Sequence, residues 1–335
     1  MIGKRQNEIL KIIVEEYIKT AKPVGSKSIC DKLNCSSATV RNEMSLLEDL
    51  GYLEKTHTSS GRIPSELGYR YYVDNLMKPK ELTGEEVLTL QTILDNKSLV
   101  LSDVITKSME IISEMTNYTS LVLGNNSLTN RLKKIETVPI NDFTIIAIVI
   151  TDKGHIENKT INIDESIDLN EIRKMVDLIN NLLVGTPIDE INKKLEFEIK
   201  PIIGKYIKQQ EMIYNVFYNA FNDIANKSNN YHFSGKTNIL EQPEFDNTDK
   251  IKNLVNKLEN KDVISSIEET NNGINVYIGE ESKIDSDVTV IKTKYDINGE
   301  IGTIAVIGPK RMEYDKVIGI LEYIKKEIET KDRGA

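Results

Sequence analysis

The chain has 335 residues, of which 39% are hydrophobic and 28% are charged, and its formal net charge is −9. This composition is typical of a globular protein of two or three domains and excludes a disordered or fibrous chain. No apolar run approaches the roughly 20 residues that span a bilayer, and the first residues do not resemble a signal peptide. We therefore expect a cytoplasmic protein without a membrane segment, whose two cysteines are reduced thiols.

The charge is distributed unevenly along the chain. Residues 1–78 hold 12 Lys/Arg and 10 Asp/Glu, a net charge of +2, whereas the remainder carries −11. An acidic body argues against binding nucleic acid over the whole surface. The near-neutral N-terminal segment could still do so locally.

Three short helices are predicted at the start of the chain. Apolar residues recur with a 3.6-residue period from Lys4 to Thr20, and Pro23 ends this first helix. Ser26 is expected to cap a second helix, and a third ends at Gly51. The tight turn between the second and third helices is typical of a helix-turn-helix unit.

The next residues extend this unit to a winged helix. Residues 52–57 alternate like a strand, residues 58–64 have the composition of a loop tip, and a helix follows from Ser65 to about Met77. We therefore expect a winged-helix DNA-binding domain at residues 1–78, followed by a linker at residues 78–80.

The remaining residues predict an α+β body with an insertion. Helices are expected at 83–94, 102–116, 169–183, 188–197, 201–225 and near the C-terminus, and strands at 121–123, 132–138, 143–150, 156–163, 263–268, 274–278, 288–295 and 301–307. Asn272-Gly273 and Asn298-Gly299 are hairpin signals. We expect a body of residues 79–163 and 211–335, interrupted by a mainly helical inserted domain at 164–210. The apolar stripe of residues 201–225 is either core or a surface packed across a two-fold axis.

The third helix carries side chains suited to reading DNA. Its outward face is expected to hold Ser37, Thr39, Arg41, Asn42 and Ser45. Arginine can contact guanine bidentately and asparagine can contact adenine, while hydroxyls and free N–H groups at a helix start suit a phosphate. Alternatively, the serines at the helix start serve only as a cap.

Three residues outside this helix are further candidates for DNA contact. His57 and Arg62 flank the small residues of the wing, and Arg62 is expected to contact a phosphate or a narrow minor groove. Lys27 could contact the DNA backbone. In the alternative interpretation, His57 is an ordinary surface residue and Arg41 pairs with Glu48.

The sequence resembles the family of bacterial heat-inducible transcription repressors, HrcA. The resemblance rests on dispersed blocks at Pro23–Ser26, Ser37–Met44, Leu47–Gly51, His57–Pro64, Gly68–Asp74, Gln242–Phe245 and Gly302–Met312, with Tyr314. Lys310 stands where the family pattern has a small hydroxyl residue, a departure that changes little for DNA binding.

The resemblance implies a winged helix, a GAF-like domain and an inserted dimerisation domain. It also implies a homodimeric repressor that binds an inverted-repeat operator in double-stranded DNA, upstream of chaperone and chaperonin operons. Its activity would depend on the chaperonin, which denatured proteins occupy after heat shock.

Two other classes of function compete with this interpretation. One is a regulator that senses a small molecule in the GAF-like domain, although no fingerprint for a nucleotide, haem or metal is present. The other is an enzyme, but the sequence lacks a P-loop, a G-x-S-x-G and an H-E-x-x-H motif. Without these motifs we expect no catalytic residue and no cofactor. We also expect no metal site, because Cys30 and Cys35 lack a second Cys/His pair at zinc spacing.

Overall fold

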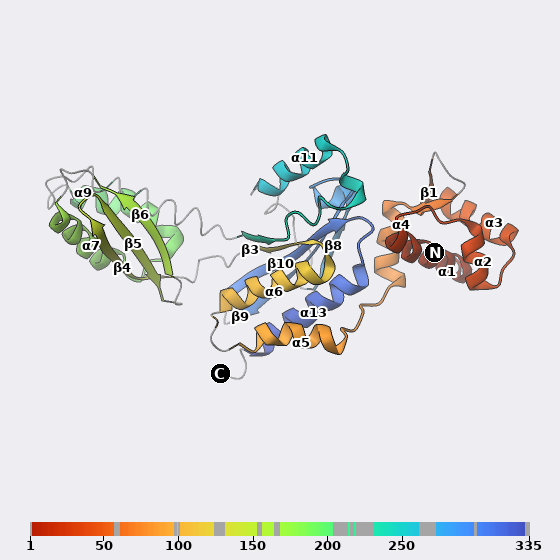
Figure 1. Cartoon of the computed structure of the whole chain (residues 1–335), viewed down its shortest axis with the longest axis horizontal. Coiled ribbons are helices and arrows are strands. Elements are labelled where there is room, and N and C mark those ends of the chain that lie inside the picture. The colour runs from red at the N-terminus through yellow and green to blue at the C-terminus, as the bar shows by residue number, and fades with distance from the viewer. Residues whose placement is uncertain are drawn as a thin grey trace. The chain divides into compact units, whose positions relative to one another are not determined.

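The computed structural model describes residues 2–56, 61–96, 99, 101–123, 131–152, 156–163, 168–203, 214, 218, 231–260, 273–297 and 300–331. The chain divides into two compact units, and Figure 1 labels many of their elements. The first unit combines residues 1–123, 232–297 and 303–335, and the second combines residues 124–231 and 298–302. The predicted α+β multidomain class is confirmed.

The N-terminal part of the first unit is a winged helix, as the sequence predicted. Its elements are α1 (Lys4–Thr20), α2 (Ser26–Leu33), α3 (Ser37–Asp49), β1 (Leu53–Lys55), β2 (Arg62–Pro64), α4 (Glu66–Tyr71) and a π-helical turn (Tyr72–Leu76). The helices share a core of buried apolar residues that includes Ile9, Leu10, Ile13, Val14, Ile29, Val40, Met44 and Leu47. The spacing of these residues directs one side of α3 into the core and leaves its other side at the surface.

The starts of α2 and α3 differ in how they are capped. Ser36 is the N-cap residue of α3, and its Oγ accepts a hydrogen bond from Thr39 N at 3.1 Å. The prediction that Ser26 caps α2 is wrong, since Gly25 occupies the cap position and makes no side-chain bond. Ser26 is the first helical residue, and its hydroxyl is engaged by α3 instead.

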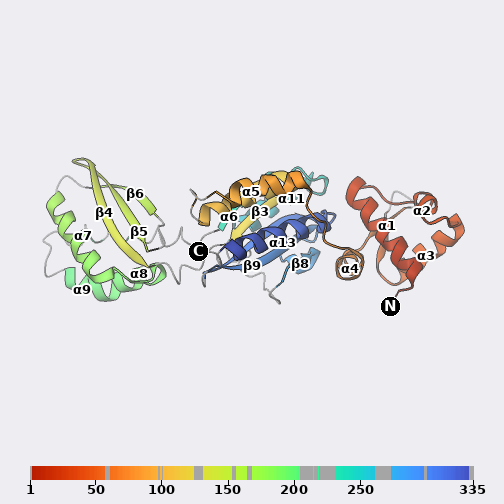
Figure 2. The same ribbon diagram turned by 90° about the horizontal axis from the view of Figure 1, so that it is seen from below.

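The larger part of the first unit is built on a five-stranded sheet of order β7–β3–β10–β9–β8. The strands are β3 (Thr119–Leu123), β7 (Tyr231–Ser234), β8 (Asn275–Ile278), β9 (Val288–Ile297) and β10 (Glu300–Pro309). Helices α5 (Gly84–Leu94), α6 (Leu101–Thr116) and α13 (Tyr314–Lys331) cover one face, and α11 (Thr248–Glu259) lies on the other (Figures 1 and 2). Short 3-10 turns occupy Pro243–Phe245 and Gly279–Ser282.

The part of the first unit that is built on the five-stranded sheet is called the sheet unit below. Several of its features agree with the prediction. The capping box of α5 is present, since Thr83 Oγ1 accepts from Glu86 N at 3.3 Å and the Glu86 carboxylate accepts from Thr83 N at 2.8 Å. The strands predicted at 288–295 and 301–307 are β9 and β10, which are neighbours in the sheet. The Asn298-Gly299 turn and the strand predicted at 263–268 lie outside the described residues.

The second unit is a three-stranded sheet packed on helices. Its elements are β4 (Leu132–Asn141), β5 (Thr144–Thr151), β6 (Ile156–Asn162), α7 (Leu169–Leu183), a 3-10 turn (Ile188–Glu190), α8 (Ile191–Lys194), a π-helical turn (Leu195–Ile199) and α9 (Lys200–Ile203). Ile145, Ala147 and Val149 alternate into a core shared with α7. Asn180 of α7 fixes β4, since its side-chain amide exchanges two 2.8 Å hydrogen bonds with the backbone of Ile135.

The extent of the inserted unit differs from the expected 164–210. Strands β4, β5 and β6 were expected in the body, but they form their own sheet inside the second unit. The second unit is therefore not mainly helical, since it contains this sheet. The strands and the helices share one core, in which α7 covers the buried face of β5. The first unit holds the winged helix and the five-stranded sheet together, so the expected boundary near residue 78 stays a prediction.

Two further expectations concern helices. Of the helix predicted at 201–225, the structure describes α9 up to Ile203 and, beyond it, Tyr214 and Tyr218, while the rest lies outside the described residues. Within the described ranges, no helix combines the length and the apolar character needed to cross a membrane.

Candidate nucleic-acid interface

The surface side of α3 collects the polar residues that the sequence singled out. Arg41, Asn42 and Ser45 are exposed, and Ser37 and Thr39 are half-buried at the start of the helix. All five belong to α3, whose opposite side is buried in the core. The helix therefore presents a guanidinium, an amide and hydroxyls together, the groups that read base edges and bind phosphates.

Arg41 is held in place by the start of α2. Its Nε donates a hydrogen bond to Ser26 Oγ at 3.3 Å, and Ser26 Oγ lies 3.0 Å from Ser37 Oγ. Nη1 and Nη2 of Arg41, the pair that can contact guanine bidentately, bond to no residue within the described part of the chain. Arg41 does not pair with Glu48 among the described ion pairs, so this alternative from the sequence receives no support.

The wing is anchored to the connection between α1 and α2. Strands β1 and β2 pair with Lys55 opposite Arg62. The backbone of Arg62 exchanges hydrogen bonds of 2.8 and 2.9 Å with the backbone of Val24. Gly61 makes this approach possible, since a Cβ there would lie 2.8 Å from Pro23 Cβ. The base of the wing is thereby fixed against the helix-turn-helix.

Arg62 is placed differently from the exposed wing-tip arginine that the sequence suggested. It lies at the base of the wing, its side chain is 13% exposed, and its Nε is 2.7 Å from Glu48 Oε2 on α3. Lys55 Nζ lies 3.1 Å from the other carboxylate oxygen of Glu48. Burial raises the pKa of Glu48, but bonds and charges from Lys55 and Arg62 outweigh this and lower it. Glu48 therefore stays charged and ties the wing to α3.

The remaining candidates are less informative. Lys27 is exposed on α2, as a contact with the DNA backbone requires. His57 and the loop of residues 57–60 lie outside the described residues, so the role of the wing tip stays a prediction. Ser26, Glu48 and Lys55 were not expected at this surface from the sequence, because their contacts join different elements of the winged helix.

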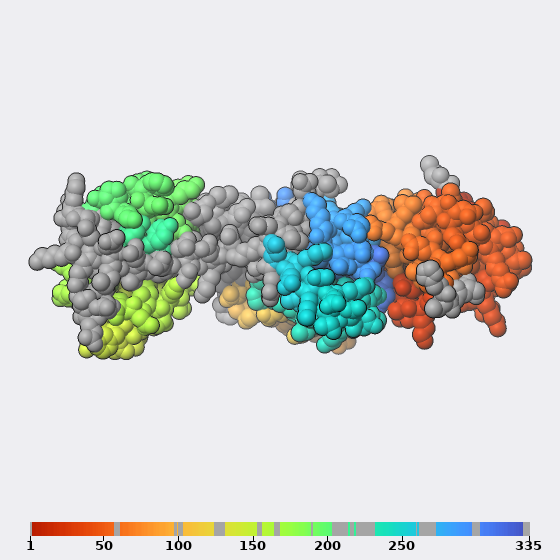
Figure 3. All heavy atoms as spheres, turned by 90° about the horizontal axis from the view of Figure 1, so that it is seen from above, coloured from red at the N-terminus to blue at the C-terminus, as the bar shows by residue number. Residues whose placement is uncertain are grey.

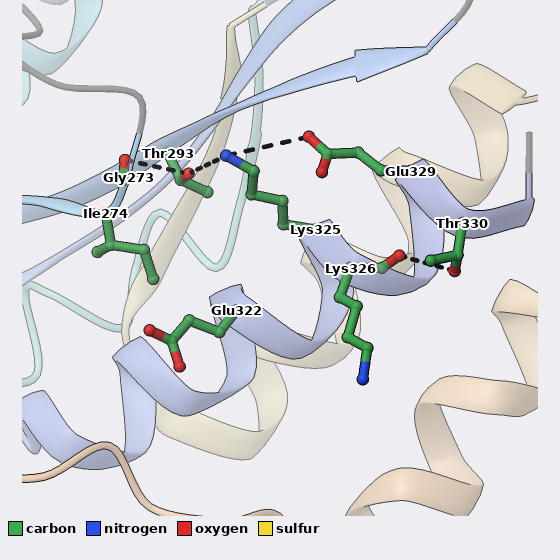
Figure 4. A pocket seen from close by; sticks show the side chains of 8 residues that line it. All are labelled: Gly273, Ile274, Thr293, Glu322, Lys325, Lys326, Glu329 and Thr330. Carbon is green, nitrogen blue, oxygen red and sulfur yellow. Dashed lines mark hydrogen bonds and ion pairs between the residues drawn. The ribbon is translucent and has the colours of Figure 1, made fainter.

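A hollow on the sheet unit bears on the alternative of a small-molecule sensor. A cavity of about 330 Å³ lies between α13 and the start of β8, and its charged lining residues are Glu322, Lys325, Lys326 and Glu329. Figure 4 shows Lys325 directed toward Thr293 of β9, at 3.5 Å, and Lys326 directed away from it. Two lysines and two glutamates balance each other, so this hollow favours no charged ligand class. Among the described residues, no group of three or more His, Cys, Asp or Glu side chains could hold a metal ion.

Comparisons with known proteins address both ends of the chain. Residues 1–72 match the family model for the winged helix-turn-helix transcription repressor HrcA, DNA-binding, and residues 102–318 match that for the HrcA protein C-terminal domain. The heat-inducible transcription repressor HrcA of Bacillus pumilus (strain SAFR-032) is 41% identical over 334 residues, covering 98% of this chain and 97% of that protein. A crystal structure of a hypothetical protein covers 100% of this chain and 99% of its own, with a TM-score of 0.69 and 23% identity. That structural likeness shows a shared fold.

Proposed function

This chain belongs to the HrcA family of heat-inducible transcription repressors, and we propose that it binds an inverted-repeat operator as a homodimer. It is a transcription repressor with a winged-helix DNA-binding domain and is not an enzyme. The operators in this proposal lie upstream of chaperone and chaperonin operons, and the chaperonin supports the active form of the repressor.

The observation that carries the DNA-binding part of the proposal is the exposed polar side of α3. Arg41 and Asn42 follow each other on this side, and the anchor from Ser26 limits the conformations of the Arg41 side chain. A pre-oriented guanidinium loses less conformational entropy when it contacts a base. We assign Arg41 and Asn42 to base contact, and Ser37, Thr39, Ser45 and Lys27 to phosphates.

The outer face of the three-stranded sheet supports the homodimer. In β5, Ile146, Ile148 and Ile150 alternate with the buried residues and point to the face opposite the core. Val138 stands opposite Ile146, and Ile156 stands opposite Ile150, so all five share this outer sheet face. Val138 and Ile156 are exposed. Together with the half-buried isoleucines of β5 they form an apolar strip that suits contact with a second copy of the chain across a two-fold axis.

The family assignment alone supports the link to the chaperonin. Under this proposal, denatured proteins that accumulate after heat shock occupy the chaperonin, the repressor loses its support, and transcription rises. A repressor of this kind works where bacterial DNA lies, so we place it in the cytoplasm. That the chain senses a small molecule stays a separate prediction. The charged residues that line the hollow beside α13 do not favour a particular ligand for it.

The test is footprinting of the full-length protein on the promoter of the chaperonin operon from the same organism. We expect a protected inverted repeat, tighter binding to it than to a scrambled duplex, and stronger protection when purified chaperonin is added. Equal affinity for the two duplexes would contradict operator binding. Protection that chaperonin leaves unchanged would contradict only the link to the chaperonin.

A further inference from the structure

Several sequence blocks shared with the family lie away from the DNA-binding surface. Residues 68–74 belong to α4 and the following π-helical turn, whereas residues 242–245 and 310–314 belong to the sheet unit. In Figure 3 the blue surface of the sheet unit directly adjoins the orange surface of the winged helix. The contacts below join these blocks at a joint between the two parts of the first unit.

The apolar part of the joint is a pair of buried tyrosines. The ring centroids of Tyr69 on α4 and Tyr314 at the start of α13 are 6.0 Å apart. Tyr314 is fully buried, and its hydroxyl donates to Lys310 O at 2.5 Å and lies 3.2 Å from Thr289 Oγ1. The Tyr314 ring is therefore fixed in orientation by its own side of the joint. The Tyr69 hydroxyl is buried without a partner among the described residues, so this ring is held by packing alone.

The polar part of the joint is centred on Arg70. Its Nη2 donates to Val276 O of β8 at 2.5 Å and to the carboxylate of Glu281. One turn earlier on α4, Glu66 Oε2 accepts from Glu280 N at 3.4 Å. Any side chain at residue 279 would displace that carboxylate, because a Cβ there would lie 2.0 Å from Glu66 Oε2. These contacts restrain rotation of α4 relative to the sheet.

The chain leaving the winged helix is fixed as well. Lys80 N donates to Asp315 O at 3.0 Å, and a Cβ at Gly319 of α13 would lie 2.1 Å from Lys80 O. Beneath the joint, Arg311 holds the turn at residues 243–245, with its Nε 2.5 Å from Glu244 Oε1. The winged helix thus contacts the sheet unit through the tyrosine pair and Arg70, and its linker is bound to α13.

From this arrangement we propose that Tyr69 and Arg70 are positioning residues, which set the angle of the winged helix on the sheet unit and so select the spacing between operator half-sites. The inference rests on the proposed binding of two half-sites by a dimer. Each half-site is read by one α3, and the distance between two α3 helices depends on how each winged helix is mounted. Neither residue belongs to the DNA-binding surface, so a change in either should alter spacing preference more than base preference.

The experiment compares duplexes that differ only in spacing. The half-site is first selected from random duplex DNA with the full-length wild-type protein, and two inverted copies are then placed at spacings that cover one helical turn, roughly 10 base pairs. We expect the wild type to prefer its best spacing over its worst by about tenfold or more, the scale of one mismatched base pair. Arg70→Ala and Glu281→Gln should reduce this preference to within about threefold, and the double variant should lose no more than either single one.

Controls distinguish an effect of the joint on half-site spacing from a general loss of folding and from a failure of the proposed function. Glu280→Gln changes the carboxylate next to Glu281. In the described contacts Glu280 takes part only through its backbone, so this variant should keep the wild-type preference. Affinity for a single half-site should be the same in all variants. If Arg70→Ala keeps the full preference, or loses affinity equally at every spacing and for the single half-site, the inference is overturned. If the wild type itself shows no preference for two inverted half-sites, the proposed function fails instead.

Discussion

Glu48 of α3 and Arg62 of β2 form an ion pair with 2.7 Å between Oε2 and Nε, across 14 residues of the chain. The pair ties the base of the wing to α3, the helix that we propose contacts DNA. It also holds the Arg62 side chain, which is only 13% exposed, against α3 and away from the surface that the sequence suggested for it.

The first prediction concerns the salt dependence of DNA binding. Each protein cation that neutralises a phosphate adds about 0.9 to the slope of log affinity against log salt concentration. Lys27→Ala should therefore reduce the slope by about one, since Lys27 is exposed. Arg62→Ala should weaken binding by displacing the base of the wing and leave the slope unchanged, because its guanidinium is bound to Glu48 and its side chain is only 13% exposed, so it does not reach a phosphate. Gel-shift titrations at several salt concentrations measure both, and a reduced slope for Arg62→Ala would show that it contacts phosphate.

The second prediction concerns pH and the Glu48 pair. Folding lowers the pKa of Glu48 below its ordinary value of 4.5, so the pair stabilises the protein above the unfolded pKa and loses this effect as pH falls through the folded pKa. Glu48→Gln should lower Tm at pH 7, and the difference from wild type should shrink as the pH falls below the ordinary range of a glutamate carboxyl and Glu48 takes up its proton in the folded protein. Thermal unfolding followed by circular dichroism gives both values. A difference that stays constant across this range contradicts the role of the pair.

The third prediction concerns base reading by Arg41. Arg41→Ala should weaken operator binding by about 1–3 kcal/mol and relax the preference at one base position. Ser26→Ala removes the anchor of Arg41 and the contact with Ser37 but leaves the Arg41 guanidinium in place, so it should weaken binding less and keep the same base preference. Affinities for single-base operator variants separate the two effects. Equal losses on operator and random duplexes for Arg41→Ala would assign Arg41 to the backbone.

Local features of the fold were predictable from sequence, and long-range pairings were not. The bounds of α1 and α7 agree with prediction, because apolar periodicity and end signals are local. The sequence did not predict which sheet contains β4, β5 and β6, because the residue pattern of a buried strand is the same whichever sheet the strand joins. The mostly small and polar residues at 124–130 are a signal that could have marked the start of the second unit.

The same distinction holds for the candidate interface. The position of Arg41, Asn42 and Ser45 on one side of α3 follows from a 3.6-residue period, which the sequence displays. The anchor between Ser26 and Arg41 and the pair between Glu48 and Arg62 span 15 and 14 residues and depend on how the helices pack. Composition does not encode which of several nearby charges will meet.

The fourth prediction concerns the close approach of α4 to the turn after α3. A Cβ at Gly68 would lie 2.2 Å from the backbone oxygen of Tyr52, which cannot move away as a side chain could. Gly68→Ala should therefore lower the free energy of unfolding by about 1–3 kcal/mol through overpacking. Gly84→Ala is the matched control, since nothing lies within 4 Å of a Cβ at this first residue of α5. Urea denaturation measures both, and equal stabilities of the two variants would contradict the close packing.

The fifth prediction concerns the outer sheet face and the dimer. A lysine in place of Val138 or Ile156 puts a charge where two copies would meet, and both residues are exposed, so the monomer fold should tolerate it. The double variant Val138→Lys/Ile156→Lys should be a monomer by light scattering, and it should bind an isolated half-site normally but the inverted repeat weakly. Phe197→Lys adds the same charge at an exposed apolar residue on the helical side of the unit and should stay dimeric. Monomers from Phe197→Lys and dimers from the double variant would place the two-fold axis at the helices, not at the sheet.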